Sequence, residues 1–474
     1  MNSLIIILLI VLYLYMIVSA ISVLLLENRN PVRSLSWVIV LVLLPIIGIV
    51  LYLLIGQNYR KQKIISKKSI RHNTKLPKTE FHPEDFSEFI GKTQFLNLIN
   101  LLNKNSDAPA YGYNKIEVLA DGEATFTSMF EAIEKAQDHI HIEFFIFGND
   151  KISNQLRELL IDKARNGIRV RMIYDYLGSF DLSKRYLQSL RDAGVYVKPF
   201  LPLRLRLRRS KINFRNHRKL LIVDGKLGFT GGLNFADRYI FGNTLGKWRD
   251  TFVKFEGAVV HGLQSLFLTD WYFVERKLIT DLKYYPEPEK YSENLVQIVS
   301  SGPDSDWESI MQGIASAIMS SGKYVYMHTP YFVPNDVILN AVSIAALSGI
   351  DVRLMIPTAS DSKLSDACTF SYLGEILEAG VRVYQYNEGF LHSKAIVIDD
   401  FISIIGSANL DERSFNQNFE ANAFIYDTET SVELRQLFIS DQDNCIEITL
   451  DDWNNRKRSQ KLKESFARLF SPII

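Results

Sequence analysis

Two segments of the chain, HRKLLIVDG at 217–225 and HSKAIVIDD at 392–400, have nearly the same pattern. Each begins with histidine and has lysine two residues later and aspartate seven residues later. Each is also followed by an asparagine 17 residues after its histidine, Asn234 in TGGLN and Asn409 in GSAN. One such match is weak, but two matches in the same context are strong. The pattern therefore predicts one catalytic centre assembled from two equivalent half-sites.

The repeat extends well beyond these motifs. NGIRVRMIYD at 166–175 resembles SGIDVRLMIP at 348–357, and DAGVYVKPF at 192–200 resembles EAGVRVYQY at 378–386. The two motif histidines are 175 residues apart, whereas solenoid and propeller repeats have periods of roughly 20 to 50 residues. We therefore expect two whole domains, 113–285 and 286–474, related by a pseudo-twofold axis.

Strand-like and helix-like segments alternate within each repeat. EVLAD, HIHIEFFIF, IRVRMIYD, VYVKPF and KLLIVDG are typical of strands, and TFTSMFEAIEKAQ and KISNQLRELLIDKARN are typical of helices. The second repeat has the same order. This alternation predicts an α/β fold with two α/β/α sandwich domains, each with a parallel or mixed sheet between helical layers.

The first 58 residues have a different character. Residues 4–26 carry no charge and, at about 1.5 Å per residue, they could span the roughly 30 Å core of a bilayer. A second apolar stretch, 37–55, follows the hinge ENRNPVRS. We expect a transmembrane hairpin at 1–58 and disfavour a cleaved signal peptide, because no basic residue precedes the first stretch.

Residues 59–112 are expected to form a basic juxtamembrane linker. Its early basic residues are Arg60, Lys61, Lys63, Lys67, Lys68, Arg71, Lys75 and Lys78. The hinge has only Arg29 and Arg33, so the positive-inside rule places the linker and the following domains in the cytoplasm. The two cysteines, Cys368 and Cys445, are far apart, which suits a reducing compartment and gives no zinc signature.

Charge is local rather than global in this chain. The net charge of +1 gives no large positive field, so nucleic acid is not an expected partner and a nuclease is weakly disfavoured. A basic segment, LPLRLRLRRSKINFRN at 201–216, is largely an insertion of the first repeat. It is either a contact with anionic lipid, attracted by about 1 kcal/mol per basic residue, or an edge strand whose arginines block pairing.

The motif residues suit displacement at a phosphodiester. On a strand, His217 and Lys219 share a face, as do His392 and Lys394, about 7 Å apart along the chain. One imidazole can attack phosphorus while the other protonates the departing alkoxide. The lysines would supply positive charge, so developing negative charge is met without a metal cofactor.

Other polar residues receive supporting roles in this interpretation. Asn234 and Asn409 are candidate phosphate-binding residues. Asp224 and Asp399 belong to the catalytic motifs, but they are out of phase with the histidine face and sit at strand ends, where we expect them to support the structure. Asp250 in KWRDTFV and Glu420 in NQNFEAN are candidate acids that orient the imidazoles, the alternative for either being a surface carboxylate.

The remaining histidines give weaker signals. His139 and His141 share a strand face, but no third residue with suitable spacing completes a metal site. His261 and His328 are expected to serve packing or hydrogen bonding.

At the paired motifs the chain resembles the phospholipase D superfamily and, within it, the bacterial cardiolipin synthases. The likeness covers nearly the whole chain, including LPIIGIVLYLLIG, FRNHRKLLIVDGKLGFTGGLNFADRY, KWRDTFVKFEG, HTPYFVPND and LHSKAIVIDDFISIIGSANLDERSFNQNFE. It implies transfer of a phosphatidyl group between two phosphatidylglycerol molecules, giving cardiolipin and glycerol without a metal. It also implies a multi-pass protein of the bacterial plasma membrane, with His217 as nucleophile and His392 as acid, although sequence symmetry alone does not distinguish the two histidines.

Two alternatives stay open at this point. The same half-sites would support hydrolysis, as in a phospholipase D or a membrane-tethered nuclease, if water reached the phosphohistidine. A non-catalytic membrane scaffold predicts broken motifs, whereas every proposed catalytic position is intact. The oligomeric state, regulation and lipid preference are not predicted.

Overall fold

The computed structural model describes residues 95–202 and 213–471, together with isolated positions between residues 7 and 48. Most of the expected transmembrane hairpin, the expected basic linker up to residue 94 and the basic residues 203–212 therefore lie outside the described residues. In the described part of the chain, no helix combines the length and hydropathy needed to cross a membrane. The chain divides into two compact units, and the following description concerns the larger one, Ile65–Pro202 with Arg215–Ile474.

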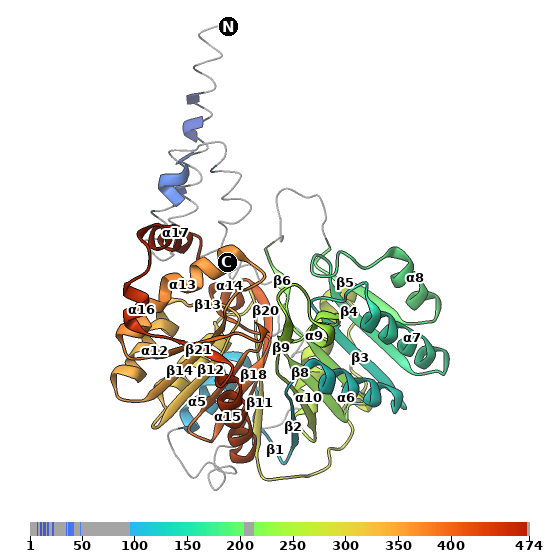
Figure 1. Ribbon diagram of the computed structural model, residues 1–474. Helices are drawn as coiled ribbons and strands as arrows, with labels where there is room; N and C mark the ends of the chain where they lie inside the picture. Colours follow the sequence, from blue (N-terminus) through green and yellow to red (C-terminus); the bar gives the residue numbers. More distant parts are fainter. Residues whose placement is uncertain are drawn as a thin grey trace. The chain divides into compact units, whose positions relative to one another are not determined.

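The first half of this unit contains a seven-stranded sheet in the order β2-β10-β8-β7-β3-β4-β5 (Figure 1). Its strands are β2 (Lys115–Leu119), β3 (His139–Phe144), β4 (Arg169–Asp175), β5 (Tyr196–Phe200), β7 (Leu220–Val223), β8 (Leu227–Gly231) and β10 (Phe252–Glu256). β3, β4 and β5 are parallel, and the other neighbours pair antiparallel. The sheet is therefore mixed, as the strand and helix alternation predicts.

The second half repeats this arrangement. Its sheet has the order β1-β11-β20-β18-β17-β12-β14-β15-β21, and the run from β11 to β15 matches the first sheet strand for strand. The strands are β11 (Leu295–Ser301), β12 (Tyr324–His328), β14 (Asp351–Pro357), β15 (Arg382–Tyr386), β17 (Ala395–Ile398), β18 (Ile402–Gly406), β20 (Asn418–Tyr426) and β21 (Cys445–Ile448). The described chain is thus an α/β protein with two equivalent sheets.

Side-chain alternation on β3 shows how each sheet is covered. Ile140 and Ile142 face a core formed with α6 (Gly122–Glu134), α7 (Lys151–Arg165) and α8 (Lys184–Asp192). The intervening polar residues face α10 (Val260–Glu275), where Gln264 hydrogen-bonds both His139 and His141. In α6, α7 and α8 the N-cap side chain, aspartate or serine, accepts from a backbone N–H of the first turn, which explains where these helices begin.

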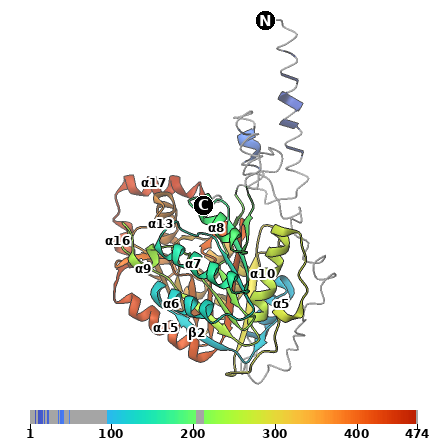
Figure 2. The same ribbon diagram turned by 90° about the vertical axis from the view of Figure 1, so that its right-hand side faces the viewer.

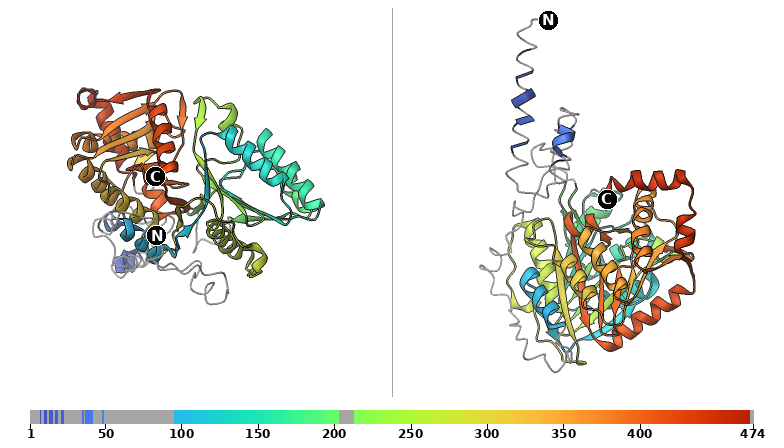
Figure 3. Two further views of the ribbon diagram at one scale, coloured as in Figure 1. Left: turned by 90° about the horizontal axis from the view of Figure 1, so that it is seen from below. Right: turned by 90° about the vertical axis from the view of Figure 1, so that its left-hand side faces the viewer.

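The second core is built in the same way. α11 (Ser309–Met319), α12 (Asp336–Leu347) and α13 (Lys363–Glu378) pack on one face of its sheet, and α15 (Thr428–Gln442) lies against the other. This half also contains α14 (Glu412–Asn416), α16 (Leu450–Asn454) and α17 (Arg458–Arg468). Figure 3 shows the two halves side by side when the molecule is seen from below.

Helix α5 (Leu96–Ser106) lies within the segment expected to be linker. Its residues Leu98, Ile99 and Leu102 are buried in the second core, and the next strand, β1 (Tyr111–Gly112), pairs with β11. Figure 1 shows α5, in blue, among the orange elements of the second half. The apolar spacing of LNLINLLNKNS is typical of a helix. The prediction of a linker rested on the basic residues that precede it.

Two short parallel strand pairs connect the halves. β6 (Arg215–Asn216), just before the first motif histidine, pairs with the beginning of β20. β16 (Gly389–Leu391), just before the second motif histidine, pairs with β9 (Lys247–Arg249). Each pair therefore holds a motif histidine next to a strand of the opposite half. Together the two pairs position the site.

Candidate active site

A cavity of about 430 Å³ is lined by residues of both halves. Both motif histidines and both motif asparagines lie in its wall, namely His217, His392, Asn234 and Asn409. The structure therefore brings together the two half-sites that the duplicated motifs predict.

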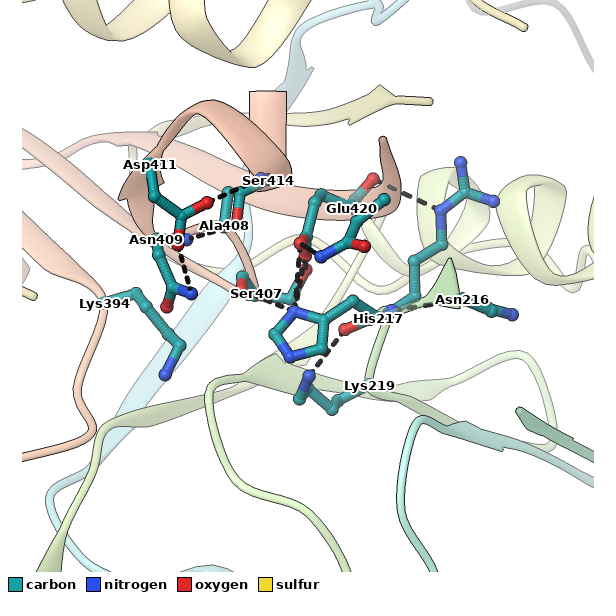
Figure 4. A network of polar contacts seen from close by, with 12 residues as sticks. Asn216, His217, Lys219, Lys394, Ser407, Ala408, Asn409, Asp411, Ser414 and Glu420 are labelled. Carbon is teal, nitrogen blue, oxygen red and sulfur yellow. Dashed lines mark hydrogen bonds and ion pairs between the residues drawn. The ribbon is translucent and has the colours of Figure 1, made fainter. Parts of the chain in front are cut away.

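His217 is held by contacts from the second half. Its backbone N–H donates to the Phe419 carbonyl at 2.9 Å, which continues the pairing of β6 with β20. Its Nδ1 lies 3.0 Å from both carboxylate oxygens of Glu420 and 3.1 Å from the Ser407 carbonyl (Figure 4). Because all these neighbours are acceptors, the proton is assigned to Nδ1, which leaves the Nε2 lone pair free to react.

His392 is held in the same way by the first half. Its N–H donates to the Arg249 carbonyl at 2.7 Å, and its Nδ1 lies 2.6 Å from Asp250 Oδ2. Asp250 Oδ1 accepts from the Thr251 N–H at 2.7 Å, which fixes the carboxylate. Both candidate orienting acids therefore contact an imidazole, and the pairing is crossed, since each acid serves the histidine of the other half.

Burial controls the electrostatics of the two histidines. It lowers the pKa of His217 to about 4 and holds the pKa of His392 well below its ordinary value. Burial also raises the pKa of Asp250 to about 7. Burial alone would also raise the pKa of Glu420. This effect is outweighed by the charge and hydrogen bond of His217, the charge of Lys219 and the Ser407 hydroxyl, so the pKa of this carboxyl is lowered.

The motif lysines lie directly behind the histidines. Lys219 Nζ donates to the His217 carbonyl at 2.6 Å, and Lys394 Nζ donates to the His392 carbonyl. Burial lowers the pKa of Lys219 to about 7 and that of Lys394 to about 8, while Glu420 and Asp250 act in the opposite direction. Two buried ammonium groups therefore lie behind the histidines rather than in the cavity wall, and both titrate near neutral pH.

The asparagines take part in different local networks. Asn234 Oδ1 accepts from the Ile146 N–H at 3.1 Å, and its Nδ2 donates to the Tyr239 hydroxyl at 3.1 Å. Asn409 Nδ2 donates to Asp411 Oδ2 at 2.9 Å. Both side chains are fixed in the wall, where an amide can meet a phosphate oxygen.

The motif aspartates Asp224 and Asp399 are not among the residues that line the cavity, and their contacts agree with the supporting role expected for them. Asp224 accepts from the backbone N–H groups of Gln137, Asp138 and His139 at 2.7–2.8 Å. Asp399 accepts from those of Gly322, Lys323 and Tyr324 at 2.6–2.9 Å. Each carboxylate therefore fastens the turn after the motif strand to the beginning of the neighbouring antiparallel strand, β3 or β12. Seven residues after the histidine, the chain has reached the other end of the motif strand, away from the cavity.

Sequence reasoning missed several residues of the cavity wall. Arg238 and Arg413 both line it, and each lies four residues after a motif asparagine, in NFADR and NLDER. This second duplicated spacing was visible in the sequence. Arg215 also lines the cavity, and it forms an ion pair with Asp175 at 3.4 Å.

Aromatic side chains pack around the histidines. The ring of Phe145 lies 5.0 Å from that of His217, and the ring of Trp248 lies 5.2 Å from that of His392. The Arg238 guanidinium stacks over Trp248 at 4.7 Å. No spacing in the sequence connects Phe145 or Trp248 to the motifs, because sheet topology alone brings them here.

A family model described as "Cardiolipin synthase, PLD-like domain" matches residues 129–271 and 314–442. The chain belongs to the cardiolipin synthase family of the phospholipase D superfamily. A second family model, "Phospholipase_D-nuclease N-terminal", matches residues 11–57.

Relatives within the cardiolipin synthase family match almost end to end. A cardiolipin synthase of Geobacillus sp. (strain WCH70) is 41% identical over 454 residues, which cover 95% of this chain and 90% of that protein. The major cardiolipin synthase of Bacillus subtilis (strain 168) is 39% identical over 468 residues, 97% of each chain. The crystal structure of phosphatidylserine synthase from Haemophilus influenzae Rd KW20 has the same fold, with a TM-score of 0.61, 17% identity and coverage of 80% of this chain and all of that one.

Proposed function

We propose that this chain synthesises cardiolipin by transferring the phosphatidyl group of one phosphatidylglycerol to the glycerol hydroxyl of another, with release of glycerol. The observation that carries the proposal is the pair of reciprocal contacts in one cavity, His217 with Glu420 and His392 with Asp250. They give two imidazoles of fixed orientation, which is what a double displacement at phosphorus requires.

In the first step His217 Nε2 attacks phosphorus of the donor lipid. A phosphorus–nitrogen bond forms, the bond to the glycerol oxygen breaks, and that oxygen takes a proton from His392 Nε2. In the second step a hydroxyl oxygen of the acceptor lipid attacks phosphorus while His392 removes its proton, and the bond to His217 breaks. The products are cardiolipin, glycerol and the original enzyme.

The assignment of His217 as nucleophile is supported by the difference between the two acids. Glu420 stays ionised because its contacts lower its pKa, so it stabilises the positive charge that His217 acquires on attacking phosphorus. His392 must instead lose and regain a proton. The anionic phosphate, once bound, favours protonation of His392 against the effect of burial.

The two buried lysines supply the charge that neutralises the phosphate. Lys219 and Lys394 are behind the imidazoles in an interior of low dielectric, where an ammonium acts more strongly than in water. Asn234, Asn409, Arg238 and Arg413 line the wall in two equivalent sets. Two sets suit two phosphatidylglycerol molecules, one serving as donor and the other as acceptor.

We further propose that the enzyme is a multi-pass protein of the bacterial plasma membrane, with a hairpin at 1–58 and both catalytic domains, 113–285 and 286–474, in the cytoplasm. The family match at residues 11–57 and the uncharged stretch at 4–26 support the anchor. Anionic lipids of that membrane would then be the surroundings and the substrate of the site.

Reconstituted full-length protein tests the reaction when it is given head-group-labelled phosphatidylglycerol and a chelator. Cardiolipin and glycerol in equal amounts are expected. Phosphatidate without cardiolipin would contradict transfer and support the hydrolytic alternative. Activity lost with chelator and restored by a metal would contradict the metal-free step.

A further inference from the structure

Helix α17 carries its large apolar side chains on the outside. Leu462 is 72% exposed and Phe466 is 64% exposed, and Leu469, immediately after the helix, is 73% exposed. Residues three and four positions apart lie on one face of a helix, so these three form a single stripe. On the opposite face Glu464 is only 5% exposed. An ordinary surface helix has the reverse arrangement, with its apolar face inward.

Specific contacts hold α17 in this orientation. The buried carboxylate of Glu464 forms an ion pair with Arg456. The carbonyl of Ala467 accepts from Cys368 Sγ of α13 at 2.9 Å. Rotating α17 to bury its apolar stripe would break the contact with Cys368 and turn the buried Glu464 carboxylate outward. The contacts of α17 therefore fix its apolar stripe on the outer face.

Basic residues surround this stripe. The segment 456–468 contains six of them, Arg456, Lys457, Arg458, Lys461, Lys463 and Arg468, and Glu464 is its single acidic residue. Within the described part of the chain, Lys457, Arg458 and Lys463 form no ion pair. We call Leu462, Phe466 and Leu469, with these three basic residues, the α17 surface.

The α17 surface lies beside the catalytic cavity. Helix α17 packs across α13, as Figures 1 and 2 show, and the first turn of α13 contributes Ser362 and Ser365 to the cavity wall. Lys463 is near enough to Asp366 for its charge to act on that carboxylate. Leu364, also in this turn, is 43% exposed. Leu364 thus adds one exposed apolar side chain next to two residues of the cavity wall.

We propose that the α17 surface docks on a bilayer containing anionic lipid, with the apolar stripe in the interface and the basic residues among the head groups. Apolar side chains flanked by lysine and arginine are the pattern of helices that lie in the membrane interface. Anionic head groups attract such basic residues. A partner protein would satisfy the stripe but would need its own acidic rim to meet Lys457, Arg458 and Lys463. This docking does not depend on which reaction the cavity catalyses.

Spin labelling of the full-length protein tests this contact directly. In a Cys445→Ser background, where Cys368 is buried, a nitroxide is placed at Leu462→Cys and the protein is reconstituted in phosphatidylcholine vesicles containing phosphatidylserine. Phosphatidylserine supplies negative charge without being the proposed substrate. If α17 docks, the label at position 462 should be less accessible to a water-soluble paramagnetic reagent than a label at an equally exposed site away from the membrane. It should be more accessible to oxygen, which partitions into the bilayer.

The matched control is Leu347→Cys on α12, which is also 72% exposed. It precedes β14, at the opposite end of the parallel strands from the cavity, so its label should stay accessible to the aqueous reagent. A label at position 462 that behaves like the control would overturn the proposal. Low accessibility to both reagents would also overturn it, because that result indicates a protein contact by a second copy or a partner. Neither readout depends on catalytic activity.

Discussion

The carboxylate of Asp250 lies 2.6 Å from Nδ1 of His392, a residue 142 positions later and in the other half of the protein. The reciprocal contact joins His217 to Glu420 across 203 positions. Neither half can therefore orient its own histidine, and catalysis requires both halves to be folded and paired.

Replacing Asp250 with asparagine tests this crossed arrangement. Asp250→Asn keeps the shape of the side chain but removes the charge that orients and stabilises the imidazolium of His392. Because acid–base catalysis contributes about 10²- to 10⁴-fold, we expect kcat to fall by at least about 10²-fold. Nitrogen NMR of labelled histidine should show the change at His392 with little change at His217. Perturbation confined to His217 would contradict the crossed pairing.

The matched variant is Glu420→Gln. It should perturb His217 in the same experiment and leave the His392 signal nearly unchanged. Thermal unfolding of both variants gives the control for folding, because loss of turnover with a preserved Tm separates orientation from collapse of the cavity.

Asp224→Ala and Asp399→Ala should reduce stability more than chemistry. Each substitution leaves three backbone N–H groups without their carboxylate acceptor. An unsatisfied buried donor costs about 1–3 kcal/mol, and water can reach part of each site, so we expect a loss of about 2–4 kcal/mol in the free energy of unfolding. Denaturant titration measures this loss. A variant of unchanged stability with abolished kcat would return these aspartates to the catalytic set.

The pH profile should be bell-shaped. His217, with a pKa of about 4, is the neutral nucleophile above that pH, so kcat/KM should rise as pH increases through about 4. Lys219 and Lys394, with pKa values of about 7 and 8, lose their charge as pH increases further. His392 must carry a proton to act as the acid, and burial lowers its pKa, so kcat/KM should fall as pH rises through that pKa. Loss of the lysine charges weakens binding of the phosphate and steepens this fall above about pH 7 to 8. A profile that stays flat to pH 10 would contradict a role for the lysine charges.

Arg238 and Arg413 should contribute equivalently to lipid binding. A hydrogen bond to a charged group is worth about 1.5–3 kcal/mol, so Arg238→Gln and Arg413→Gln should each lower kcat/KM about tenfold or more. Arg435→Gln is the control, since Arg435 forms an ion pair with Asp400 outside the cavity. Kinetics with phosphatidylglycerol in mixed micelles would show the difference. Equal effects of all three substitutions would contradict specific binding in the cavity.

Much of the site follows from local sequence patterns. The duplicated spacing predicts which histidines, lysines and asparagines come together, because each motif is one strand with its following loop. The two acids could be named from their similar positions in the repeats. Their pairing could not be predicted, since it depends on β6 and β16, strands of only two and three residues that bond to the opposite half. Helix α5 was missed for a related reason. The hydrophobic core against which it packs begins nearly 200 residues further along the chain, at Leu295.

The division of labour between the histidines is the central claim, and a phosphatidyl ester of p-nitrophenol tests it most directly. This leaving group departs without a proton, so His392→Ala should still form the intermediate but fail to pass it on. We predict a burst of about one equivalent of p-nitrophenol and a phosphatidyl group on His217, held by a base-stable, acid-labile phosphorus–nitrogen bond and located by peptide mapping. His217→Ala should give no burst. A burst from His217→Ala with the label on His392 would contradict the account.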